Sequence, residues 1–197
     1  MRTLLWFRGS DLRLRDQPAV ADAAAADECV AVFVLEPPTG RANHRRYLLE
    51  ALADLDDAIS QAGGRLLVRE GVPASELKTL AGEVGADCLV GIRGTDPAGR
   101  RIDAELERTF GDSVRLHDSA TLQPPGTLRT GAGNPYSVFT PFARAFRSRV
   151  EVPRPGAPPA SMTVASIETE GVELPRPDAA SGFLPGGESA AGARLRS

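Results

Sequence analysis

The sequence predicts an α/β fold, a Rossmann-like doubly wound five-stranded parallel sheet with helices on both faces, followed by a Pro/Gly-rich linker. Three observations carry this prediction. Short apolar runs alternate with helix-length amphipathic stretches along the chain. Within the runs the apolar residues are nearly continuous, as in strands that are buried on both faces. A strand–helix–strand order implies right-handed crossovers, which build a parallel sheet covered by helices.

The apolar runs predict the strands. The clearest is CVAVFVL, which is dense in β-branched residues and is closed by Pro37 and Pro38. The first run, TLLWF, shows no alternation of polar and apolar residues and is therefore expected in the middle of the sheet. In chain order, the predicted strands cover residues 3–7, 29–35, 65–69, 88–92 and 113–117.

The stretches between these runs predict the helices. Pro18 suits a first helical turn, and Gly63 with Gly64 ends the longest helix. That helix carries one apolar stripe, and its acidic residues Glu50, Asp54 and Asp57 are expected to face water. In chain order, the predicted helices cover residues 18–26, 43–62, 73–84, 100–110 and 138–149.

The domain organisation changes near residue 150. Residues 1–150 are predicted to form the α/β domain. Residues 151–187 are rich in Pro, Gly, Ala and Ser, and they predict a linker that wraps a surface rather than forming a core. Residues 189–196 predict the first turns of another helix, so residues 151–197 are interpreted as a linker and the truncated start of a second, helical domain.

Composition limits the function classes. The net charge of −3 over 197 residues argues against a basic nucleic-acid-binding surface spread over the whole chain. Cys29 and Cys88 sit in apolar runs and are expected to be buried, reduced thiols, and no metal site is predicted. Without a signal peptide or a membrane-length apolar run, a cytoplasmic protein with no membrane contact is expected.

Ligands of open parallel sheets bind beyond the carboxyl ends of the strands, which directs attention to the loops there. None of these loops contains a G-x-G-x-x-G or Walker A motif, so a nicotinamide dinucleotide is not expected. The loop 8–16, RGSDLRLRD, interleaves Arg and Asp. It is interpreted as an ion-pair network that fixes the turn, with anion binding as the alternative.

Three segments make the chain resemble the DNA photolyase/cryptochrome family, specifically its N-terminal α/β (antenna) domain. The first is LLWFRGSDLRLRDQPAV, which is similar to the family's Trp-Phe-Arg and Asp-Leu-Arg-Leu opening. The second is LQPPGTLRTGAGNPYSVFTPFARAF, and the third is FLPGGESAAGARL, which resembles the start of the family's helical domain. The three occur in the family's order across nearly the whole chain.

This resemblance implies a parent protein that is a deoxyribodipyrimidine photolyase, a carbon–carbon lyase that repairs pyrimidine dimers in DNA with light and FAD. In the family, FAD and the dimer pocket belong to the helical domain, so that domain is the expected partner, and damaged DNA is reached only through the parent. The chain alone is expected to be inactive, with no catalytic residues. The alternatives are a fragment of a cryptochrome-type photoreceptor and a stand-alone, non-catalytic relic or interaction module.

The resemblance also implies an antenna role, in which this domain holds methenyltetrahydrofolate or 8-hydroxy-5-deazaflavin. Ile92 and Gly94 stand where the family often has an amide and a carboxylate, which weakens the pattern. Each candidate contact also has a plainer interpretation as a solvated loop residue. The candidate contacts are Glu36, His44, Arg93 and Asp96.

The aromatic residues Phe139, Phe142 and Phe146 recur on one face of the predicted helix 138–149. Without a partner domain, this apolar face is expected to be partly uncovered, which favours self-association. The one tryptophan, Trp6, lies in the first predicted strand and is expected in the core rather than in an electron relay.

Overall fold

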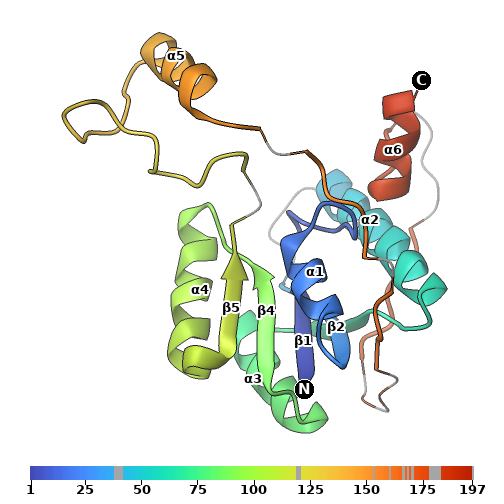
Figure 1. The fold of residues 1–197 in the computed structure, drawn as a ribbon. Helices are drawn as coiled ribbons and strands as arrows, with labels where there is room; N and C mark the ends of the chain where they lie inside the picture. The colour runs from blue at the N-terminus through green and yellow to red at the C-terminus, as the bar shows by residue number, and fades with distance from the viewer. Residues whose placement is uncertain are drawn as a thin grey trace.

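The five predicted strands form one parallel sheet in the order β3-β2-β1-β4-β5 (Figure 1). The computed structural model describes residues 1–37, 42–118, 121–152, 154–159, 161–165, 167, 169, 171–177 and 183–196. The strands are β1 (Arg2–Phe7), β2 (Glu28–Leu35), β3 (Leu67–Glu70), β4 (Cys88–Ile92) and β5 (Val114–His117). The predicted five-stranded parallel sheet is therefore confirmed.

Helices cover both faces of this sheet. Side chains of α1 (Pro18–Ala24) and α2 (Ala42–Gln61) share one hydrophobic cluster with the sheet. Side chains of α3 (Pro73–Val84) and α4 (Pro97–Phe110) share the other. The remaining helices are the 3₁₀ turn η1 (Gly111–Ser113), α5 (Phe139–Arg149) and α6 (Glu188–Arg196). This two-sided cover confirms the doubly wound prediction.

The central strand β1 explains why its sequence does not alternate. Leu5 and Phe7 belong to the cluster beneath α1 and α2, whereas Leu4 and Trp6 belong to the cluster beneath α3 and α4. Successive side chains of a strand point to opposite faces, so a strand between two apolar layers needs apolar residues at every position.

Two elements start two or more residues away from their predicted first residue. Helix α4 begins at Pro97 rather than at residue 100, because the Asp96 side chain caps it and Pro97 occupies its first turn. Strand β3 covers Leu67–Glu70 rather than 65–69. In that region Leu66 is held outside the ladder, where its backbone N–H donates to the Asp56 Oδ1 atom at 2.9 Å.

The linker enters the core, contrary to the expectation from its composition. Met162, Val164 and Ala165 are buried. The Cys29 backbone N–H donates to the Thr163 carbonyl at 2.8 Å, and the Ala165 N–H donates to the Cys29 carbonyl at 2.7 Å. The prediction that this segment stays outside the core is wrong at these residues, because the backbone pairing draws their side chains into the sheet's apolar layers.

The acidic face of α2 does not simply face water either. The backbone N–H of Gly186 donates to the Glu50 carboxylate at 2.9 Å, and that of Ser189 donates to the Asp54 carboxylate at 3.0 Å. Glu188 at the start of α6 also accepts a hydrogen bond, at 2.9 Å, from the backbone N–H of Leu14 in the loop after β1. The acidic residues thus fasten α6 beside α2, and Figure 1 shows the two helices next to each other.

Helix α5 projects away from the sheet (Figure 1). Phe139 is 77% exposed and Phe142 is 36% exposed. The Phe142 ring packs edge-on against Tyr136 at 6.1 Å and lies 5.9 Å from Phe146. The predicted apolar, partly uncovered face on this helix is therefore confirmed.

Both thiols are buried and free, as predicted. Burial raises the pKa of Cys29 to about 11, which keeps this thiol protonated and unreactive near neutral pH. Among the described residues, no group of His, Cys, Asp and Glu side chains is arranged to hold a metal ion. No helix in the described part of the chain is long and apolar enough to cross a membrane.

Candidate functional site

A cavity of about 280 Å³ opens beyond the carboxyl ends of β1, β2 and β4. Chain order reverses here, because β1 pairs with β2 on one side and with β4 on the other, so the cavity lies at the topological switch point of the sheet. We call it the switch-point cavity. It is lined by Trp6, Phe7, Arg8, Gly9, Ser10, Phe33, Val34, Glu36, Pro73, Gly94, Thr95, Asp96, Ala98, Gly99 and Ile102.

Three aromatic residues at the strand ends line the switch-point cavity. Trp6 and Phe7 end β1, and Phe33 lies near the end of β2; all three are buried. The Arg8 guanidinium lies 4.2 Å from the centre of the Trp6 ring, a cation–π contact. The lining therefore combines aromatic residues of two strands with a guanidinium that lies over the Trp6 ring.

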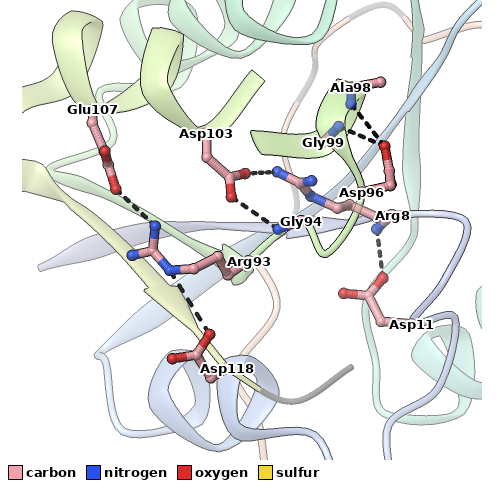
Figure 2. Close-up of polar contacts among 10 residues, drawn as sticks. All are labelled: Arg8, Asp11, Arg93, Gly94, Asp96, Ala98, Gly99, Asp103, Glu107 and Asp118. Carbon is pink, nitrogen blue, oxygen red and sulfur yellow. Dashed lines mark hydrogen bonds and ion pairs between the residues drawn. The ribbon is translucent and has the colours of Figure 1, made fainter. Parts of the chain in front are cut away.

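A buried ion pair between Arg8 and Asp103 holds the wall of the cavity (Figure 2). The Arg8 side chain is 12% exposed and that of Asp103 is 4% exposed. Asp103 also accepts a hydrogen bond from the Gly94 backbone N–H at 2.9 Å. One carboxylate on α4 thus fixes the loops that follow β1 and β4.

The loop after β1 is fixed in a second way by Asp11. Its carboxylate accepts from the Arg8 backbone N–H at 2.6 Å, and the residue is only 2% exposed. Burial raises the pKa of Asp11 to about 6, against the hydrogen bond from Arg8, which acts to lower it. The predicted turn-fixing role of this loop is thus filled by Asp11 locally and by Asp103 from α4.

Gly94 is required by close packing. A Cβ atom at Gly94 would lie 2.5 Å from the Gly99 carbonyl carbon and 2.6 Å from an Arg8 guanidinium nitrogen. No side chain fits there while Arg8 pairs with Asp103. The Arg8 guanidinium occupies part of the space that a side chain at position 94 would need.

Asp96 is occupied in capping α4. Its Oδ1 atom accepts from the backbone N–H of Ala98 at 2.8 Å and of Gly99 at 3.0 Å, as Figure 2 shows. These bonds hold the pKa of Asp96 below its usual value. The side chain therefore remains a carboxylate at the rim of the switch-point cavity.

The structure brings together two of the four candidate contacts. Glu36 and Asp96 both line the switch-point cavity. Arg93 does not line it, but lies in a neighbouring cavity of about 470 Å³ and pairs with Glu107 at 3.0 Å and with Asp118 at 3.9 Å. His44 is exposed on α2 and is not part of either lining.

Sequence reasoning alone misses the roles of Trp6, Arg8 and Asp103. Trp6 is buried, as a core residue should be, yet it also lines the cavity. Asp103 reads in the sequence as one more charge on a charged helix. The available signal is its spacing, because Asp103 lies four residues after Gly99 and three before Leu106, on the buried face of α4, but its partner Arg8 is far away along the chain.

Comparison with known proteins assigns the chain to a protein family. Residues 3–160 match the family model described as DNA photolyase. The chain belongs to the DNA photolyase family. It is 36% identical over 98% of its length to a deoxyribodipyrimidine photo-lyase of Thermus thermophilus, covering 44% of that relative. It is 31% identical over 98% of its length to a cryptochrome DASH of Natronomonas pharaonis, covering 46% of it.

Solved photolyase-family structures share the fold. A class III photolyase from Agrobacterium tumefaciens matches 99% of the chain with a TM-score of 0.89 and 32% identity, over 44% of its own length. A Synechocystis cryptochrome matches with a TM-score of 0.84 at 22% identity, which speaks for the fold alone. The chain thus corresponds to the N-terminal α/β domain of the family and spans less than half the length of these relatives.

Proposed function

We propose that this chain is the antenna domain of a deoxyribodipyrimidine photolyase and that it holds a light-harvesting pigment in the switch-point cavity. The observation that carries the proposal is the cavity itself, which lies at the switch point of the sheet and has Trp6, Phe7 and Phe33 in its lining. Pockets lined by aromatic residues and a few polar groups suit a planar conjugated ring system.

The residues present fit the ring portion of such a pigment. The cavity of about 280 Å³ is near the lower end of ligand pockets, so it suits one ring system rather than a whole dinucleotide. Ser10, Glu36 and Thr95 lie exposed in the lining and can exchange hydrogen bonds with ring-edge nitrogen and oxygen atoms. Both 8-hydroxy-5-deazaflavin and methenyltetrahydrofolate have such edges, and either pigment supplies absorption of near-ultraviolet or blue light.

The parent activity belongs to the longer protein that the relatives represent. In this proposal, FAD and the pocket for damaged DNA lie in a helical domain that α5 and α6 meet. The exposed Phe139 and Phe142 on α5, and the fastening of α6 to α2, support such a docking surface. The chain itself contributes binding and orientation of the pigment and performs no bond chemistry of its own.

Pigment binding is tested by titrating the full chain with 8-hydroxy-5-deazaflavin and with methenyltetrahydrofolate. Trp6 is the single tryptophan of the chain and lines the cavity, so its emission reports occupancy directly. We expect saturable quenching of Trp6 emission and a shifted pigment absorption band with at least one of the two pigments. A protein that binds neither would overturn the antenna function.

The site is located by two matched substitutions on α4. Ala98 lines the switch-point cavity, whereas Ala104 lines the neighbouring cavity, and both lie on the same helix. Ala98→Phe is expected to abolish pigment-dependent quenching of Trp6 emission by filling the mouth of the switch-point cavity. Ala104→Phe is expected to leave the quenching intact, and phenylalanine adds no second tryptophan to the signal. Equal loss in both variants, or in neither, would place the pigment elsewhere.

A cryptochrome-type photoreceptor is the second candidate for the parent. Similarity to the cryptochrome DASH of Natronomonas pharaonis favours it, at an identity close to that of the photolyases. The two candidates differ in the region of the relatives that this chain does not span. A dimer-repair assay on the longer protein, with and without light, separates them.

A further inference from the structure

The charge balance of the switch-point cavity is negative at its mouth. Its ionisable lining residues are Arg8, Glu36 and Asp96. Arg8 is committed, because its guanidinium is paired with the buried Asp103 and lies over the Trp6 ring. What the mouth offers to a ligand is therefore two exposed carboxylates, one from the end of β2 and one from the start of α4.

The start of α4 would otherwise attract an anion. Ala98 and Gly99 line the cavity, and their N–H groups lie in the first turn of a 14-residue helix. Free N–H groups in such a turn favour phosphate groups. In this chain, both N–H groups donate to the same oxygen of Asp96. The chain's own carboxylate thus occupies the position where a phosphate would be bound.

The backbone is closely packed around this turn. Gly94 and Gly99 are in backbone contact, since a Cβ at Gly99 would lie 2.9 Å from the Gly94 Cα atom. An approaching phosphate would have to displace Asp96 or stand beside its charge, and at low ionic strength the repulsion between these like charges is only weakly screened.

We propose that Asp96 is a specificity-determining residue that excludes phosphate-bearing ligands, so that the switch-point cavity selects ring pigments without a phosphate group near the ring. This inference rests on the proposed pigment site and adds which chemical class the site rejects. Glu36, which also lines the cavity, acts in the same direction. Flavin nucleotides are disfavoured relative to phosphate-free flavins and deazaflavins that carry a similar tricyclic ring.

Riboflavin and FMN provide a matched test, because they differ only by one phosphate. Trp6 emission of the full chain, corrected for flavin absorbance, is titrated with each at low ionic strength. We expect the wild-type protein to prefer riboflavin by roughly fivefold, as one exposed like-charge contact predicts. Asp96→Asn keeps a capping side chain but removes the charge, and it is expected to reduce the preference at least several-fold.

The control variant is Asp112→Asn, which removes an exposed carboxylate just beyond the other end of α4. It is expected to leave the riboflavin-to-FMN ratio unchanged. Equal or tighter binding of FMN by the wild-type protein would overturn the proposal. An unchanged ratio in Asp96→Asn would overturn it as well.

A second measurement needs no pigment. The backbone amide resonances of Ala98 and Gly99 are followed by NMR while inorganic phosphate is added. We expect no saturable shift in the wild-type protein and a saturable shift in Asp96→Gly, which frees both N–H groups. A saturable shift in the wild-type protein, or none in the variant, would contradict the role of Asp96. If neither flavin binds but phosphate behaves as expected, the pigment site fails while the exclusion of phosphate stands.

Discussion

At the scale of single residues, the Arg8–Asp103 pair is the most consequential polar contact of the domain. It is nearly buried, and Asp103 also receives the Gly94 N–H. Asp103→Ala leaves a buried guanidinium without its partner, so we expect a loss of about 3–5 kcal/mol in the free energy of unfolding, measured by denaturant titration.

An exposed ion pair provides the control for Asp103→Ala. Arg176 and Asp57 pair at 2.8 Å with side chains 63% and 55% exposed. Because solvent already screens these charges, Asp57→Ala is expected to change the free energy of unfolding very little. Equal destabilisation by both substitutions would show that burial does not determine how much the Arg8–Asp103 pair contributes to the free energy of unfolding.

Asp11 gives the stability of the domain a pH dependence of unusual sign. Its pKa rises from 3.8 to about 6 on folding because of burial, so the folded state binds a proton more tightly than the unfolded state. The contribution of Asp11 is most favourable below pH 4 and is lost as the pH rises through 6.

Asp11→Asn removes this titration while keeping an acceptor for the Arg8 N–H. Relative to the wild-type protein, the variant is expected to gain stability between pH 4 and pH 7, by on the order of 3 kcal/mol. Denaturant titrations across this pH range measure the difference. A difference between the two proteins that does not vary with pH would contradict the burial of a charged Asp11.

At the scale of elements, the packing of the linker residue Val164 in the core depends on Gly64. A Cβ at Gly64 would lie 2.2 Å from the Val164 Cβ atom. Gly64→Ala is therefore expected to push residues 162–165 out of the core, costing about 1–3 kcal/mol and speeding proteolytic cleavage between residues 154 and 177. Gly82→Ala is the control, because nothing lies within 4 Å of that Cβ and alanine favours helix α3 by about 1 kcal/mol.

The elements also show which predictions a sequence can support. Strands and helices up to β5 follow from apolar runs and amphipathic stripes, because these patterns are local. The placement of Glu50 and Asp54 could not be predicted, since their partners Gly186 and Ser189 lie more than a hundred residues away along the chain. The start of α4 is readable from Asp96-Pro97, a capping residue followed by a first-turn proline, and the predicted start at residue 100 does not use that signal.

The candidate site was predictable only in outline. Its place at the carboxyl ends of the strands follows from the fold class, and Glu36 and Asp96 do share one cavity. The separation of Arg93 and His44 from that cavity depends on side-chain direction and, for Arg93, on ion pairs with Glu107 and Asp118. Neither side-chain direction nor such ion pairs can be inferred from the local sequence pattern.

At the scale of the whole molecule, the exposed aromatic face of α5 governs association. Phe139 and Phe142 project from a helix that stands apart from the sheet. We expect the average mass measured by light scattering to rise with protein concentration, and the double substitution of Phe139→Ser and Phe142→Ser to suppress that rise. Leu195→Ser, which alters a residue 90% exposed on α6, is expected to leave the rise unchanged. A wild-type protein that stays monomeric at every concentration would contradict this expectation.

The insertion of the linker into the core affects how the protein folds during its synthesis on the ribosome. The sheet is complete in sequence at His117, yet the apolar layer beneath α1 and α2 also includes Met162 and Val164 of the linker. At about 5–20 residues per second, translation needs a few more seconds to reach them. During that interval part of this apolar layer stays exposed in the nascent domain. The layer can be completed only after the linker, which leads to α6, has been synthesised.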